Sequence, residues 1–233
     1  MRLAMIVLAA AATLALLGAC RQNSPAPPAA HGIPAHETTP PEGPHLHVLA
    51  LGDSLFAGYG LRPDQAYPER LEAALRAGGL AVGIANAGVS GDTSADGLAR
   101  LDFTLANQPR TPDLVLISLG GNDMLRGLPP EQTRANLAAI LARLRQLHIP
   151  VLLMGMLAAP NMGKAYASRF DAIYPALARR YHAALVPFFL AAVIDRPALR
   201  QADHIHPTAA GVDAIVAATR GAVTKALAER APS

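Results

Sequence analysis

The chain has 233 residues, of which 52% are hydrophobic and 16% are charged, and its net charge is +3. This length fits one globular domain with additional segments, and the apolar content excludes disorder over most of the chain. The weak positive charge comes from scattered basic residues, so the composition argues against a nucleic-acid partner.

The first residues have the pattern of an export signal. Arg2 supplies one positive charge, and residues 3–19 then form an uninterrupted run of apolar and small side chains. Such a segment is typical of a signal peptide and does not belong to the folded domain. An uncleaved anchor helix is the alternative, because the run approaches the roughly 20 residues that span a bilayer.

The run ends in Leu17-Gly18-Ala19-Cys20, which resembles a bacterial lipobox, whose cysteine is lipidated and becomes the new N-terminus. Cys20 is the only cysteine, so the chain cannot form an internal disulfide. We therefore expect residues 1–19 to be a signal peptide and Cys20 to be a membrane anchor. Arg21 follows in place of the Asp that marks inner-membrane retention, which favours the periplasmic side of the outer membrane. A soluble periplasmic protein is the alternative.

The segment from Cys20 to residue 44 is rich in proline. Proline disfavours helix and favours extended, polyproline-like chain, so we expect residues 20–44 to be a tether and residues 45–233 to be the folded domain. The prolines of this segment are Pro25, Pro27, Pro28, Pro34, Pro40, Pro41 and Pro44.

Beyond the tether, short apolar runs alternate with helical patterns. The predicted strands are His47–Leu51, Ala81–Ala85, Asp113–Leu119, Pro150–Met154 and Ala184–Phe188. The predicted helices are Tyr67–Ala77, Ser94–Ala106, Glu131–Leu147, Tyr166–Tyr181 and Thr208–Glu229. Apolar strands that alternate with helices imply a parallel sheet covered on both faces. We predict a flavodoxin-like, three-layer α/β/α sandwich with five parallel strands, whose site lies outside the carboxyl ends of the strands.

Polar and small residues follow the first strand at Gly52-Asp53-Ser54-Leu55. A serine at this point presents its hydroxyl at the edge of the sheet, where it could act as a nucleophile. Serine is also a common helix cap, and this segment by itself does not separate the two interpretations.

Two further strand ends carry small and polar residues. The segment Asn86–Ser94 is glycine-rich, which permits close approach of a ligand and offers backbone N–H donors, although a loop with a helix cap would look the same. The glycine-rich stretch Gly83–Gly91 lacks the G-x-G-x-x-G spacing and the acidic ribose partner of a dinucleotide site. After the third strand, Asn122 could donate its amide to a developing oxyanion or stabilise a turn.

A carboxylate and an imidazole follow the fifth strand, at Asp203 and His206. The acid can hold the imidazole in the tautomer that accepts a proton from a serine hydroxyl. Loops at four strand ends therefore each supply one part of a serine hydrolase, and this convergence carries more weight than any single motif.

These segments resemble the GDSL or SGNH hydrolase family, whose four sequence blocks centre on Ser, Gly, Asn and His. The resemblance places the nucleophile at Ser54, the third triad member at Asp203 and the base at His206. It implies an oxyanion hole made of Ser54, Gly88 and Asn122. Residues 90–101, 120–127, 173–175 and 186–189 extend the resemblance to the periplasmic acyl-CoA thioesterase/lysophospholipase and arylesterase branch.

The resemblance implies a serine esterase that cleaves carboxylic esters or thioesters through an acyl-enzyme. The expected substrates are small acyl esters, thioesters or lysophospholipids, and no cofactor or metal is expected. We expect Asp53 and Asp123 to be structural hydrogen-bonding groups at the rim of the site, and count them with Leu125 and Pro160 as candidate substrate contacts. Phe56 and His204 depart from that branch beside catalytic residues, so they bear on substrate preference.

Three other functions compete with this prediction. His204 and His206 could bind a metal together, but no other cluster supplies the remaining ligands at a suitable spacing. A non-catalytic surface lipoprotein on the same fold would be expected to lack a triad member. A sugar O-acetyl esterase is the alternative within the esterases, and the shortage of aromatic residues counts against it.

Overall fold

A single parallel sheet forms the centre of the computed structural model, which describes residues 45–229. Its five strands lie in the order β2-β1-β3-β4-β5, and all four neighbouring pairs are parallel. The strands are β1 (Leu46–Gly52), β2 (Val82–Gly88), β3 (Leu114–Ser118), β4 (Val151–Met154) and β5 (Ala184–Val186). Each of the five predicted strands overlaps one of these, so the predicted parallel sheet is confirmed.

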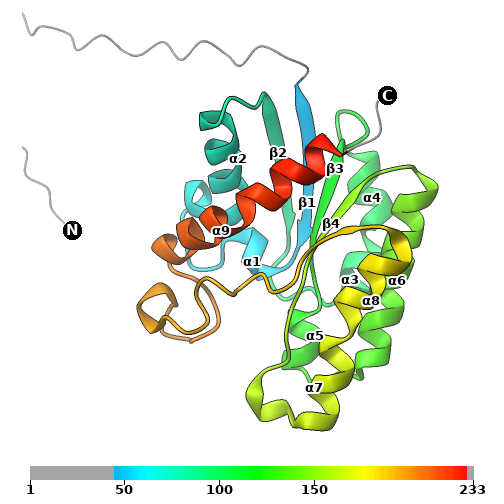
Figure 1. The fold of residues 1–233 in the computed structure, drawn as a ribbon, viewed down its shortest axis with the longest axis vertical. Helices are drawn as coiled ribbons and strands as arrows, with labels where there is room; N and C mark the ends of the chain where they lie inside the picture. Colours follow the sequence, from blue (N-terminus) through cyan, green and yellow to red (C-terminus); the bar gives the residue numbers. More distant parts are fainter. Residues whose placement is uncertain (1–44, 230–233) are drawn as a thin grey trace, which may run out of the picture. The chain divides into compact units, whose positions relative to one another are not determined.

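Helices cover both faces of this sheet (Figure 1), with α2 and α9 packed together on one face and α3, α6 and α8 on the other. The three-layer arrangement is therefore the predicted one. The helices are α1 (Ser54–Ala57), α2 (Tyr67–Ala77), α3 (Ser94–Ala99), α4 (Leu101–Ala106), α5 (Gly121–Leu125), α6 (Pro130–Gln146), α7 (Lys164–Asp171), α8 (Ile173–Tyr181) and α9 (Ala209–Ala228). Short 3₁₀ turns are η1 (Pro63–Gln65), η2 (Pro160–Met162) and η3 (Pro197–Leu199).

Two predicted helices are each divided in the structure. The helix predicted over 94–106 breaks at Arg100, whose guanidinium is held by Asp92 at 2.6 Å and by the Gly52 carbonyl at 2.9 Å. The helix predicted over 166–181 breaks at Ala172. The restart places Pro175 in the first turn of α8, where a residue without an N–H donor is tolerated.

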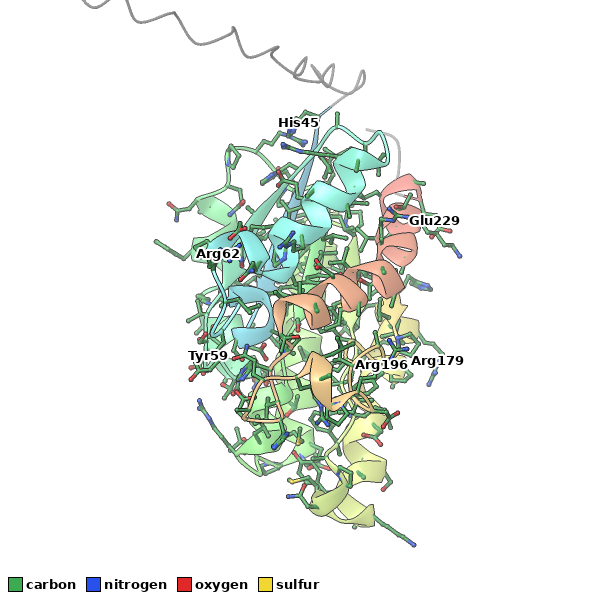
Figure 2. The ribbon with its side chains drawn as sticks, turned by 90° about the vertical axis from the view of Figure 1, so that its left-hand side faces the viewer. His45, Tyr59, Arg62, Arg179, Arg196 and Glu229 are labelled. Atoms are coloured by element: carbon green, nitrogen blue, oxygen red, sulfur yellow. The ribbon has the colours of Figure 1, made fainter. Side chains whose placement is uncertain are left out.

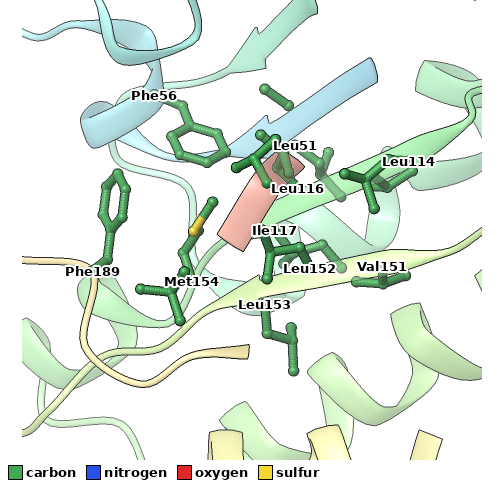
Figure 3. Close-up of a cluster of buried hydrophobic side chains, with 14 of the residues drawn as sticks. Leu51, Phe56, Leu114, Leu116, Ile117, Val151, Leu152, Leu153, Met154 and Phe189 are labelled. Carbon is green, nitrogen blue, oxygen red and sulfur yellow. The ribbon is translucent and has the colours of Figure 1, made fainter. Parts of the chain in front are cut away.

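The core lies on the three central strands. Every residue of β1, β3 and β4 is buried, whereas the edge strands β2 and β5 are partly exposed. Figure 3 shows Phe56 and Phe189 beside the strand side chains of this core. The Phe56 ring is fully buried, 5.3 Å from Tyr67 in a stacked arrangement and 5.7 Å from Phe189 edge-on. Phe56 therefore anchors α1 to the core and does not border the substrate site.

The predicted signal peptide (1–19), Cys20 and the tether (20–44) lie outside the described residues. Within residues 45–229, no helix combines the length and the apolar character needed to cross a membrane.

Candidate active site

Ser54 stands at the carboxyl end of β1, where the chain turns from strand into helix. Asp53 caps the helix, because its side chain accepts a hydrogen bond from the Leu55 N–H at 3.0 Å. Ser54 is the first residue of α1, which has only four residues and ends at Gly58 in the left-handed conformation, with φ 74°. The sharp turn brings the Ser54 hydroxyl to the edge of the sheet.

His206 joins Ser54 to Asp203 through its two ring nitrogens. The Ser54 Oγ lies 2.8 Å from His206 Nε2, and the Asp203 Oδ2 lies 2.7 Å from His206 Nδ1. The backbone N–H groups of Ile205 and His206 donate to Asp203 Oδ1 at 2.9 and 3.0 Å, which fixes the carboxylate within its own loop.

These contacts determine which atoms of Asp203, His206 and Ser54 carry the protons. Burial opposes ionisation of Asp203, but hydrogen bonds from the His206 ring and from the two backbone N–H groups outweigh it and lower the pKa of Asp203 to about 2. An ionised Asp203 accepts the Nδ1 proton, so in the neutral imidazole Nε2 is left to accept the hydrogen bond that the Ser54 hydroxyl donates.

The predicted oxyanion donor Gly88 needs correction. Gly88 is the last residue of β2, and its N–H donates to Asn86 Oδ1 at 2.9 Å. A Cβ at this position would lie 2.3 Å from the Ala57 nitrogen, so the close packing of β2 against α1 requires glycine here. The reason for glycine at position 88 is therefore packing rather than chemistry.

Gly91, in the same loop, does line the site beside Ser54 and Asn122. It adopts φ +91°, and Arg126 donates to its carbonyl at 2.6 Å. Over the described part of the chain, the N–H groups of Ser54 and Gly91 have no protein partner. The Asn122 Nδ2 donates to the Asp92 carbonyl at 2.9 Å, which holds the amide in place and leaves its second hydrogen for a ligand.

A cavity of about 760 Å³ opens in front of Ser54 and His206, within the range of small-molecule sites. Most of its lining surface is apolar. Further polar groups come from Asp53, Ser90, Asn122, Arg200 and His204. The apolar wall residues are Leu55, Met124, Leu125, Met156, Leu157, Ala158, Ala159, Pro160, Phe188, Leu190 and Ile194.

Sequence comparison places this geometry in a known class, since a model of the GDSL-like lipase/acylhydrolase family matches residues 50–214. The chain belongs to this family. It is 42% identical over 160 residues to an arylesterase of Vibrio mimicus, a match that covers 69% of this chain and 79% of that protein. It is also 42% identical over 161 residues to the thioesterase 1/protease 1/lysophospholipase L1 of Escherichia coli K12, covering 69% and 74% of the two chains.

The solved structure of AlinE4, described as an SGNH-hydrolase family esterase, is 56% identical with a TM-score of 0.68. That match covers 82% of this chain and 99% of the other. The predicted family, SGNH fold and activity class are confirmed, and the chain is a carboxylic ester hydrolase of the serine type.

Not all of the four residues predicted to contact substrate line the cavity of this GDSL-like hydrolase. Asp53, Leu125 and Pro160 line the cavity, and Leu125 is 51% exposed at its mouth. Asp123 does not line it. The residue is 1% exposed, and its carboxylate accepts hydrogen bonds from the Ser94 backbone, the Ser94 hydroxyl and the Thr133 hydroxyl. Asp123 joins α3, α5 and α6, so the prediction of a substrate contact there is wrong.

Asp53 lines the cavity although only 2% of it is exposed. Burial raises the pKa of this carboxyl to about 7, and the nearby carboxylates of Asp92 and Asp123 add to the effect. A carboxyl group that titrates near neutral pH therefore lies directly beside the Ser54 backbone.

His204 lines the cavity from the same loop as His206, in the left-handed conformation with φ 59°. Both ring nitrogens of His206 already face Ser54 and Asp203. In residues 45–229 no three His, Cys, Asp or Glu side chains gather in a way that could hold a metal ion.

Tyr59 is a site residue that sequence reasoning missed. Its ring lies 4.5 Å from the His206 ring at a tilt of 33°, and it borders the cavity. Figure 2 shows His45 at the top of the described domain and Tyr59 well below it, on the left of the view. The contact joins residues far apart in the sequence, and no local pattern signals it.

Proposed function

We propose that this esterase works through an acyl-enzyme on Ser54, with His206 as the general base and Asp203 as the group that orients it. The observation that carries the proposal is the unbroken series of hydrogen bonds from Asp203 through His206 to Ser54 at the mouth of an apolar cavity. Such a series is the arrangement that activates a serine hydroxyl.

In the first step the Ser54 Oγ attacks the carbonyl carbon of an ester or thioester while His206 Nε2 takes the hydroxyl proton. The tetrahedral intermediate then breaks its bond to the leaving oxygen or sulfur, and His206 returns the proton to that atom. In the second step Nε2 takes a proton from water, the water oxygen attacks the acyl carbon, and Ser54 leaves with the proton.

The negative charge on the tetrahedral intermediate needs donors that are already in place. We propose the N–H groups of Ser54 and Gly91 and the free Nδ2 hydrogen of Asn122, all of which border the cavity. Donors fixed in advance stabilise developing charge without reorganising during the reaction. Gly91 replaces Gly88 in this role.

The size and lining of the cavity support a finer substrate assignment. An apolar wall that continues from Met124 to Ile194 suits an acyl chain longer than acetyl, with the ester carbonyl at Ser54. The leaving group lies on the side of His206, which must protonate it. Aryl esters, thioesters and lysophospholipids with such chains share this arrangement, whereas an O-acetyl group on a sugar would leave the apolar wall uncovered.

Active-site labelling and a substrate series test these two parts of the proposal. A fluorophosphonate probe should modify Ser54 stoichiometrically, and mass spectrometry of the labelled peptide would locate it. Turnover of p-nitrophenyl esters should rise from acetate to octanoate, because each added methylene finds apolar surface. A label on another residue would overturn the role of Ser54, and highest activity on acetate would overturn the acyl-chain assignment.

We also propose that the hydrolase is exported and that its domain, residues 45–233, is attached through Cys20 to the periplasmic side of the outer membrane. The proposal rests on the apolar run of 3–19 and on the Leu17-Gly18-Ala19-Cys20 segment. The mature N-terminal peptide should begin with a lipid-modified Cys20, and a Cys20→Ala variant should move from the membrane to the soluble fraction. An unmodified N-terminus elsewhere would contradict it.

A further inference from the structure

Gln201 connects two segments that carry the reacting groups, residues 54–60, here the nucleophile segment, and residues 203–207, here the base segment. Its side-chain amide donates to the Tyr59 carbonyl at 2.7 Å and to the Pro207 carbonyl at 2.9 Å. Its backbone N–H donates to the His206 carbonyl at 2.8 Å, and its carbonyl accepts from the His204 N–H at 3.0 Å. Both amide hydrogens and both backbone groups of Gln201 are therefore used in this one place.

The nucleophile segment is shaped to fit against this amide. Gly60 adopts φ +72°, and a Cβ at that position would lie 2.4 Å from Gln201 Oε1. Glycine is thus required both by the backbone conformation and by the close approach of the Gln201 side chain.

The same contact holds the backbone of Tyr59. Gln201 donates to the Tyr59 carbonyl, and the Tyr59 ring lies beside the His206 imidazole at a centroid distance of 4.5 Å. The imidazole is thereby bordered on one side by an aromatic ring while its two nitrogens face Ser54 and Asp203.

Few other contacts join the two segments. Between residues 54–60 and 203–207, the described chain has one direct hydrogen bond, from Ser54 to His206, in addition to the ring contact of Tyr59. That hydrogen bond does not survive the reaction, since the Ser54 hydroxyl loses its proton and the oxygen then carries the acyl group. In the acyl-enzyme, before water attacks, contacts that do not involve the reacting atoms must therefore hold the nucleophile segment and the base segment in the same relative position.

We propose that Gln201 is the positioning residue that keeps His206 within reach of Ser54 throughout the catalytic cycle. This inference rests on the proposed roles of Ser54 and His206. Gln201 touches no reacting atom. It acts through the backbone carbonyls of Tyr59 and Pro207 and through the backbone of His206.

Two variants remove the contact in different ways. Gln201→Met keeps a similar volume and loses both donated hydrogen bonds. Gln201→Glu keeps the shape but places a carboxylate against two carbonyl oxygens, where it has no hydrogen to donate. We expect both variants to lower kcat by about 10- to 100-fold, because a displacement of His206 from Ser54 by about 1 Å has an effect of this size. The KM should stay within about twofold of the parent value. The rate of fluorophosphonate labelling at Ser54 should fall in the same proportion.

Gln108→Met is a matched control at the far end of the sheet. Gln108 also joins distant segments, because its side chain donates to the Thr104 carbonyl at 2.9 Å and its Oε1 lies 3.0 Å from His47 Nε2. This variant should lose thermal stability while keeping the parental kcat. The comparison separates a positioning effect from a general loss of stability.

All rates are referred to the number of folded sites, counted by exhaustive labelling with the fluorophosphonate. A kcat for both Gln201 variants within twofold of the parent, or a loss no larger than that of Gln108→Met, would overturn the inference. Failure of both variants to fold would overturn it too, by assigning Gln201 to folding. If the parent itself is not labelled at Ser54, the proposed function fails instead, so the two failures are distinguishable.

Discussion

The two ends of the parallel sheet each carry a histidine beside an aspartate, yet only one end has the form of a reactive site. At the amino end, the His47 N–H donates to Asp113 at 2.7 Å, and His47 Nε2 lies 3.0 Å from Gln108. Arg110 pairs with Asp113 and donates to the His45 carbonyl at 2.6 Å. These groups connect β1 to the segment before β3.

At the carboxyl end the same residue types have different neighbours. His206 faces a serine hydroxyl, its aspartate has no arginine partner among the described residues, and a cavity opens beside it. Backbone N–H groups of Ser54 and Gly91 also remain for a ligand there. At the amino end the aspartate accepts from the His47 backbone N–H, whereas at the carboxyl end Asp203 contacts the His206 ring and the other ring nitrogen faces a hydroxyl. The comparison teaches that a histidine beside an aspartate becomes a candidate catalytic pair only when the carboxylate holds the imidazole ring and the free ring nitrogen faces a nucleophile.

Of the substitutions at either end of the sheet, loss of the nucleophile should lower kcat the most. Ser54→Ala removes the attacking oxygen and should lower kcat by about 10⁴-fold or more, since a triad without its nucleophile retains only binding and oxyanion stabilisation. The variant should fold, because the Ser54 side chain makes its one hydrogen bond within residues 45–229 to His206, and the Ser54 carbonyl still accepts from the Gly58 N–H. Hydrolysis of p-nitrophenyl octanoate measures the effect, and turnover near the parental rate would remove the carboxyl end from the mechanism.

Loss of one oxyanion donor should lower kcat less than loss of the nucleophile does. Asn122→Ala removes one donor and should lower kcat by about 10²–10³-fold, which corresponds to about 2.7–4 kcal/mol of transition-state stabilisation. Loss of the bond to the Asp92 carbonyl should cost only about 1 kcal/mol of folding stability. Kinetics and thermal unfolding of the same sample separate the two effects. A kcat within threefold of the parent would show that Asn122 only holds its loop.

The carboxyl end was also the more predictable part of the molecule. Ser54 and Asn122 follow the apolar runs of β1 and β3, and parallel strands bring such positions to one edge. Asp203 and His206 lie farther along, in the loop between η3 and α9, and the pairing of a carboxylate with an imidazole, together with the family resemblance, singled them out. The choice between Gly88 and Gly91 could not be made in this way. Both are glycines of one loop, and only the structure shows that the Gly88 N–H is used by Asn86 and that Gly88 packs against α1.

Long-range contacts set the other limit on prediction. Gln201 and Tyr59 are 142 residues apart in the sequence, and no periodicity or spacing links them. The breaks at Arg100 and Ala172 also escaped prediction, because apolar periodicity continues across both positions. Asp123 resembled a rim residue since it follows Asn122, but the turn into α5 directs its carboxylate toward Ser94 and Thr133.

The amino end should respond to mutation through stability alone. His47 is 8% exposed, so His47→Ala should lower the free energy of unfolding by about 1–3 kcal/mol, through lost packing and an unpaired Gln108 oxygen. The kcat per labelled site should stay at the parental value, because the ring lies at the opposite end of β1 from Ser54. Urea unfolding and active-site titration measure the two quantities. A fall in kcat of tenfold or more would show that the two ends are coupled.

The smallest effect concerns Asp53, a buried carboxyl group at the carboxyl end. Asp53 takes part in none of the ion pairs found in residues 45–229, in contrast to Asp113, and burial raises its pKa to about 7. The folded state therefore favours the uncharged form of Asp53 relative to the unfolded chain, whose carboxyl titrates near 3.8. The stability that this difference contributes is present at low pH and is lost as the pH rises through about 7.

Asp53→Asn should remove that dependence, because the amide oxygen still accepts the hydrogen bond from Leu55 and carries no charge at any pH. Between about pH 6 and about pH 8 the free energy of unfolding of the parent should fall by about 1 kcal/mol more than that of the variant. Asp203 stays ionised over this range, since its pKa is about 2, so it does not contribute to the slope. Urea unfolding at both pH values provides the comparison. Parallel curves for parent and variant would mean that Asp53 is charged in the folded state at neutral pH, and the carboxyl end would then hold a buried, unpaired anion beside Ser54.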